Sequence, residues 1–87
     1  MKSKYQFEIM DLEDGLVAVP VGSNGQQFHG ILKVNETATS ILKLLEHDTS
    51  EEAITNSLIK EYTGDHEEIA MYVHAFLEML ITEGILA

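Results

Sequence analysis

Residues 30–38, Gly-Ile-Leu-Lys-Val-Asn-Glu-Thr-Ala, change from the periodicity of a strand to that of a helix at a single residue. Before Asn35, the apolar Leu32 and Val34 flank Lys33, and this alternation is typical of a half-buried strand. Asn is a favoured N-cap because its side-chain oxygen accepts a hydrogen bond from an unpaired N–H of the first helical turn. The apolar residues that follow recur at the three- and four-residue spacing of a helix face, and they are Ala38, Ile41, Leu42 and Leu45. This stretch therefore divides the chain into an extended first part and a helical second part.

The length and composition indicate one small domain. The chain has 87 residues, which allow one modest core, and we expect a single domain over residues 1–87. It has no cysteine, which excludes disulfides, thiolate metal ligands and cysteine nucleophiles, and a domain of this size without crosslinks suits a reducing compartment. The basic start is not followed by the apolar core of a signal peptide, and no apolar run approaches the length of a membrane span. These features predict a cytoplasmic domain.

The chain is strongly acidic, with 5 basic and 15 acidic residues and a formal net charge of −10. Such a surface repels phosphate backbones and anionic membranes, so we expect neither nucleic acid nor membrane as a partner. Acidity also keeps a small domain soluble, and this role of the charge stays open beside any role in steering a partner.

Three short strands are expected before Asn35, over residues 4–11, 16–21 and 28–34. Residues 13–15, Glu-Asp-Gly, indicate a tight turn, and the glycine-containing residues 22–27 indicate a polar loop. Pro20 cannot donate to a sheet ladder, so it belongs at an edge or a strand end. In the first strand one face carries the three apolar side chains Tyr5, Phe7 and Ile9. The order predicts a small antiparallel meander.

Three helices are expected after Asn35. The first runs from Glu36 to about His47, and the second follows Thr49, which has a capping-box spacing to Glu52. The third opens at Asp65 with Glu68 and extends to just before Gly84; both of its ends carry the expected signals, a capping pair and a glycine. Three strands followed by three helices with short connections predict an α+β domain that is winged helix-turn-helix-like.

The sequence lacks the motifs of catalysis. The four histidines do not have the spacing of metal ligands, and His74 with Glu78 is best interpreted as a solvated pair on one helix. The serines have no nucleophile-elbow context, and the glycines of residues 22–25 precede a strand and not a helix, so they do not form a dinucleotide fingerprint. We therefore expect no enzyme activity, no metal and no cofactor.

The third helix has a wider apolar arc than a surface helix needs. Its central stripe predicts core packing and consists of Ile69, Val73, Phe76, Leu77 and Leu80. Tyr72 and Met79 lie along one border of that stripe, and Ala75 and Met71 lie further round. Two interpretations stay open: either the helix packs between two others, or this rim lines a groove in which methionines adapt to apolar ligands.

The third strand raises a similar question. In a meander of sequential order it lies at the edge of the sheet, where its backbone groups have no partner on one side. The only charged residue in this strand is Lys33, and it has no proline to protect the edge, while Gly30 leaves the backbone accessible. Such an edge beside an apolar rim favours β-augmentation by a peptide, and pairing with a second copy through the same edge is the alternative.

The chain resembles the family named for coenzyme PQQ synthesis protein D, the PqqD-like proteins. The resemblance covers nearly the whole sequence. It is carried by residues 17–20 (VAVP), by residues 34–38 (VNETA) continuing into 41–45 (ILKLL), by residues 54–62, and by residues 76–80 (FLEML) with 83–86 (EGIL). The loop at residues 22–27 departs from the short connection of the PQQ-pathway members, which favours another modified-peptide pathway.

The resemblance implies a non-catalytic peptide chaperone. Such a domain binds the leader of a ribosomally made precursor peptide along its third strand and against its third helix, and presents it to a modifying enzyme, often a radical-SAM protein. Carried over by position, the implied peptide-binding residues are Phe28, His29, Gly30, Ile31, Leu32, Lys33 and Val34 of the strand, with Met71, Tyr72, Ala75 and Met79 of the helix.

Two other functions compete with this one. The chain could be a structural subunit or dimerisation module of a modifying-enzyme complex that never touches the peptide. It could also be a DNA-binding winged helix, which calls for a basic recognition helix; however, the second helix has only Lys60 and the third has no Lys or Arg.

Overall fold

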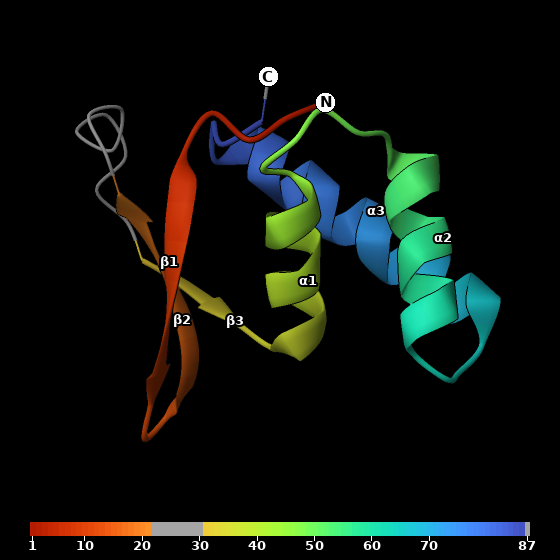
Figure 1. The fold of residues 1–87 in the computed structure, drawn as a ribbon, viewed down its shortest axis with the longest axis horizontal. Helices are drawn as coiled ribbons and strands as arrows, with labels where there is room; N and C mark the ends of the chain where they lie inside the picture. Colours follow the sequence, from red (N-terminus) through yellow and green to blue (C-terminus); the bar gives the residue numbers. More distant parts are fainter. Residues whose placement is uncertain (22–30, 87) are drawn as a thin grey trace.

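The computed structural model describes residues 1–21 and 31–86. The three-stranded antiparallel sheet followed by three helices confirms the predicted α+β class (Figure 1). The elements are β1 (Gln6–Leu12), β2 (Gly15–Val21), β3 (Leu32–Val34), α1 (Glu36–Leu44), α2 (Glu51–Glu61) and α3 (His66–Thr82). In Figure 1, α1 stands between the sheet and α2, and α3 crosses behind both helices. None of the described helices is both long enough and apolar enough to cross a bilayer.

The sheet has the predicted meander order, with β2 between β1 and β3. Two residues form the turn between β1 and β2, and Gly15 follows with a φ of 122°, which other residues rarely adopt. The described part of β3 pairs with β2 only from Leu16 to Ala18. Pro20 therefore lies near the end of β2, beyond that pairing, where a missing N–H is tolerated.

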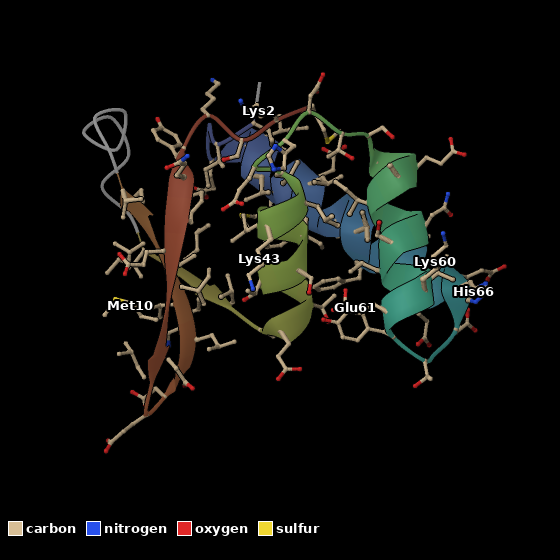
Figure 2. All side chains as sticks on the ribbon, in the orientation of Figure 1. Lys2, Met10, Lys43, Lys60, Glu61 and His66 are labelled. Atoms are coloured by element: carbon tan, nitrogen blue, oxygen red, sulfur yellow. The ribbon has the colours of Figure 1, made fainter. Side chains whose placement is uncertain are left out.

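One face of the sheet packs on the helices. Ile9, Ala18 and Leu32 lie opposite one another across the three strands, and Ala18 is fully buried. Met10, the next residue of β1, points away from the helices and is 45% exposed (Figure 2). The alternation predicted for the first strand is confirmed by the half-buried Tyr5, Phe7 and Ile9.

The first helix begins as predicted and ends earlier than predicted. Asn35 Oδ1 accepts a hydrogen bond of 2.8 Å from the backbone N–H of Ala38, so Asn35 is the N-cap. α1 then ends at Leu44 and does not reach His47. The reason is that the N–H groups of Glu46 and His47 donate to carbonyls only three residues back, which tightens the chain into a turn.

The second helix is capped by a different residue from the one predicted. Ser50 Oγ accepts a hydrogen bond of 3.1 Å from the N–H of Ala53, so Thr49 is not the N-cap. The backbone N–H of Thr49 instead donates to the carbonyl of Met1 at 2.8 Å, which holds Thr49 outside the helix. In α3 the prediction is confirmed, because Asp65 Oδ1 accepts from the first-turn N–H groups.

The two ends of the described chain are joined through the backbone. The N–H of Ser3 donates to the carbonyl of Leu45 at 3.0 Å, and the N–H of Lys4 donates to the carbonyl of Ile85 at 2.9 Å. Ser3 also forms an isolated bridge with Leu86, and the side chains of Ile85 and Leu86 are buried in the core. Figure 1 shows both ends on the same side of the molecule.

The helices supply most of the core. The stripe predicted on the third helix is confirmed, because Val73, Phe76, Leu77 and Leu80 are buried and Ile69 packs against them. The other fully buried large side chains are Ile41, Leu45, Ile54, Leu58 and Ile85.

Candidate functional site

The strand predicted to bind a peptide, residues 28–34, is described from residue 31 onward. Leu32 and Val34 are half-buried against the core, while Lys33 is exposed on the other face. Ile31 comes just before β3 and is 63% exposed. The predicted site residues that lie outside the described part are Phe28, His29 and Gly30.

β3 has an open edge in the described part of the molecule, where its sheet neighbour is β2 alone. Hydrogen-bonded pairs alternate with non-bonded pairs along an antiparallel ladder, and a two-residue turn closes on a bonded pair, here Leu12 with Gly15. From that pair onward, every second residue of β2, including Val17, bonds to β1. Leu16 and Ala18 lie between these positions, so their backbone groups point toward β3. The residue between their partners is Lys33, so its N–H and C=O face away from the sheet.

The predicted rim of the third helix forms a stripe along α3. Tyr72, Ala75 and Met79 are three and four residues apart and thus share one face. Tyr72 and Met79 are half-buried against the core, whereas Ala75 is exposed and the neighbouring Met71 is 71% exposed. This exposure favours a rim over a helix enclosed between two others.

Tyr72 connects the stripe to the end of β3. Its hydroxyl donates a hydrogen bond of 3.1 Å to Asn35 Oδ1, the oxygen that caps α1. The Tyr72 ring stacks on Phe76, with ring centroids 6.1 Å apart and planes inclined by 12°. Because Asn35 directly follows β3, this contact holds the strand end beside α3. The sequence indicated Asn35 only as a cap, and its second hydrogen bond has no sequence signal.

A hollow of about 320 Å³ lies where the strand end meets the helices. It is lined by Asn35, Thr37, Leu58, Tyr62, Thr63, Gly64, Asp65, Glu68, Ile69 and Tyr72. The lining comes from the start of α1, the end of α2 and the first turns of α3. Sequence reasoning missed this hollow because Asp65 and Glu68 fit a capping box, and periodicity cannot show which residues surround a turn.

His74 on α3 lies close to two carboxylates at the surface. His74 Nδ1 lies 3.2 Å from Glu51 Oε2, and His74 Nε2 lies 3.6 Å from Glu78 Oε1. His74 is 60% exposed, in agreement with the solvated pair predicted from the sequence, and Glu51 of α2 is an added partner. Within residues 1–21 and 31–86, no group of three or more His, Cys, Asp or Glu side chains is arranged to hold a metal ion.

Comparisons with known proteins match this architecture. The family model described as coenzyme PQQ synthesis protein D (PqqD) matches residues 9–86. The solved structure "TbiB1 in Complex with the TbiA(beta) Leader Peptide" is 21% identical with a TM-score of 0.72, and the match covers 99% of this chain and 94% of that one. "Lasso peptide synthetase B1 complexed with the leader peptide" is 18% identical with a TM-score of 0.66, covering 97% and 93%. No curated protein matches the chain.

Proposed function

Because the chain belongs to the PqqD family, we propose that it binds the leader segment of a ribosomally synthesised precursor peptide and presents that peptide to a modifying enzyme. The leader adds to the sheet as a strand on the open edge of β3 and packs against the stripe of α3. We call this surface the leader groove, and it comprises residues 31–34 with Met71, Tyr72, Ala75 and Met79.

The observation that carries this proposal is the outward-facing backbone of Lys33 beside an apolar helix rim. In β-augmentation, main-chain hydrogen bonds supply affinity, and pockets for alternate side chains supply specificity. The Tyr72–Asn35 hydrogen bond holds the edge and the rim together before any peptide arrives. Such preorganisation lowers the entropy lost on binding.

The similar structures add support for the ligand class. Both were determined as complexes with leader peptides, and both span nearly the whole of this chain. We propose further that this chain is a non-catalytic adaptor in the cytoplasm and that the chemistry belongs to a separate enzyme. A radical-SAM protein is the partner that the family resemblance implies.

A backbone substitution tests the proposal. Lys33→Pro removes the outward N–H and leaves the ladder with β2 intact, because that N–H is not used by the sheet. Lys33→Ala removes the side chain alone and is the matched control. We expect wild type and Lys33→Ala to select the same β-forming sequences from a displayed library of random dodecapeptides. Lys33→Pro should select none of them.

The outcome that contradicts peptide binding at β3 is equal selection by Lys33→Pro. Circular dichroism establishes that each variant is folded. Sedimentation velocity distinguishes the alternative of dimerisation through the same edge: a dimer of the wild type that Lys33→Pro converts to a monomer would assign the edge to a second copy.

A further inference from the structure

We infer that the hollow beside Asn35 is a subsite that takes one basic side chain, Lys or Arg, of the bound peptide. This inference rests on the proposed function, because it places the peptide on β3. It goes beyond that function by naming a residue class that the chain recognises. We call the hollow the basic subsite, with the ten lining residues given above.

The position of the subsite follows from two shared residues. Asn35 directly follows β3 and Tyr72 belongs to the leader groove, and both also line the hollow. A peptide strand paired with β3 advances about 3.3 Å per residue, so one or two residues past Val34 it reaches Asn35 and the hollow. A single side chain at that end of the peptide then enters the subsite.

The walls suit a long side chain with an apolar stem. Leu58 forms part of the lining although it is fully buried in the core, and Ile69 is half-buried beside it. Tyr62 and Tyr72 add aromatic surface, which attracts a cation as well as an apolar stem.

Several hydrogen-bond donors of the hollow already have partners. The Tyr72 hydroxyl donates to Asn35, and the Tyr62 hydroxyl lies 2.9 Å from Ser40 Oγ and 3.4 Å from the carbonyl of Glu36. The first-turn N–H groups of α3 at Glu67 and Glu68 donate to Asp65 Oδ1, at 2.7 and 3.4 Å. An anionic side chain would lie at a helix N-terminus, but it would also be repelled by the carboxylates of Asp65 and Glu68.

Acceptors for a basic side chain are available in the hollow. Both capping bonds go to Asp65 Oδ1, so Asp65 Oδ2 can accept another donor. Glu68 is exposed and lines the hollow, and no Lys, Arg or His is among the described lining residues. A guanidinium or ammonium group supplies several donors and a positive charge, and charge-assisted bonds to carboxylates are the stronger kind. The net charge of −10 adds long-range attraction for such a group.

The test uses a charge-matched pair of variants of the full chain. Glu68→Gln neutralises a lining residue, whereas Glu67→Gln makes the same change one residue away, outside the lining and also in the first turn of α3. Asp65 is kept because it caps α3. Wild type and both variants are panned against the displayed dodecapeptide library. Calorimetry then measures the affinity of each protein for the best selected peptide, once with its basic residue and once with Gln in its place.

We expect the wild type and Glu67→Gln to select β-forming peptides with Lys or Arg at one fixed position near an end. Glu68→Gln should lose that positional preference and bind the basic peptide about two- to fivefold more weakly, as expected when an exposed ion pair loses one charge but keeps an acceptor oxygen. Selected β-forming peptides with no fixed basic position, or an equal effect of both variants, would overturn the basic subsite and leave peptide binding intact. If Lys33→Pro selects the same peptides as the wild type, the proposed function itself fails, and the two failures are thus distinguishable.

Discussion

The hydroxyl of Tyr72 and the amide backbone N–H of Ala38 both donate to one oxygen, Asn35 Oδ1, at 3.1 and 2.8 Å. Asn35 is thus the N-cap of α1 and the anchor of α3 at the end of β3. An amide oxygen has two lone pairs and can accept both bonds, which a residue without a side-chain acceptor cannot do. A double substitution can measure how strongly the two roles depend on each other.

We expect Asn35→Ala to lower the free energy of unfolding by about 1–2 kcal/mol, because it removes the cap and the acceptor for Tyr72 together. Tyr72→Phe alone should cost about 0.5–1 kcal/mol. In the Asn35→Ala background, however, Tyr72→Phe should cost almost nothing, since its acceptor is already gone. Urea denaturation of the four proteins measures the coupling, and additive costs would mean that the hydrogen bond does not contribute to stability.

A pair of isoleucines compares a buried with an exposed position. Ile85 is fully buried and comes after the last helix, whereas Ile81 in α3 is 47% exposed. We expect Ile85→Ala to cost about 2–4 kcal/mol by removing buried surface and leaving a cavity, and Ile81→Ala to cost below about 1 kcal/mol. Thermal and urea unfolding check the difference. Similar costs at both positions would place the residues after α3 outside the core.

The cap of α2 predicts unequal effects at two adjacent residues. Ser50→Ala should lower the free energy of unfolding by about 1 kcal/mol because Ser50 Oγ accepts from the N–H of Ala53. Thr49→Ala should lower the free energy of unfolding by less, because Thr49 bonds to the carbonyl of Met1 through its backbone N–H, which the substitution keeps. If urea denaturation showed a larger loss of stability for Thr49→Ala than for Ser50→Ala, Thr49 would be the N-cap, as the sequence predicted.

The first residue influences the titration of Asp48. The Met1 ammonium lies 2.8 Å from Asp48 Oδ1, and its hydrogen bond and charge hold the pKa of that carboxyl below the ordinary value of 3.8. Because the folded pKa is the lower one, this contact stabilises the fold above the ordinary pKa, and the stabilisation is lost as pH falls through the folded pKa. Carbon-13 NMR should show Asp48 titrating below 3.8. Acetylation of the N-terminus should raise that pKa, and an unchanged value would show that the pair does not form in solution.

The local features of this fold were predictable because they depend on neighbours in sequence. Alternating apolar residues indicated β1, and the spacing from Ala38 onward indicated α1 with its cap at Asn35. The core stripe of α3 followed from the helical period, as the burial of Leu80 shows. The order of the sheet followed because strands joined by short connections usually pair.

The features that the sequence did not reveal depend on contacts between distant residues. Thr49 and Ser50 are both good caps, and the backbone bond from Thr49 to Met1 decides between them. The burial of Ile85 depends on the N-terminal segment, because the N–H of Lys4 donates to the carbonyl of Ile85. The Tyr72–Asn35 hydrogen bond joins residues 37 positions apart, and the apolar period of α3 carries no sign of it.

The joined ends of the chain lie at the opposite end of α1 from the basic subsite. Ser3 bonds to Leu45 after the last turn of α1, whereas Asn35 caps its first turn, and nine helical residues separate the two by about 13 Å. A fluorescent protein or a surface tether fused at either end would therefore leave the basic subsite uncovered. A short linker between the ends, with a cut in the turn before Gly15, would give a circular permutant of the same fold.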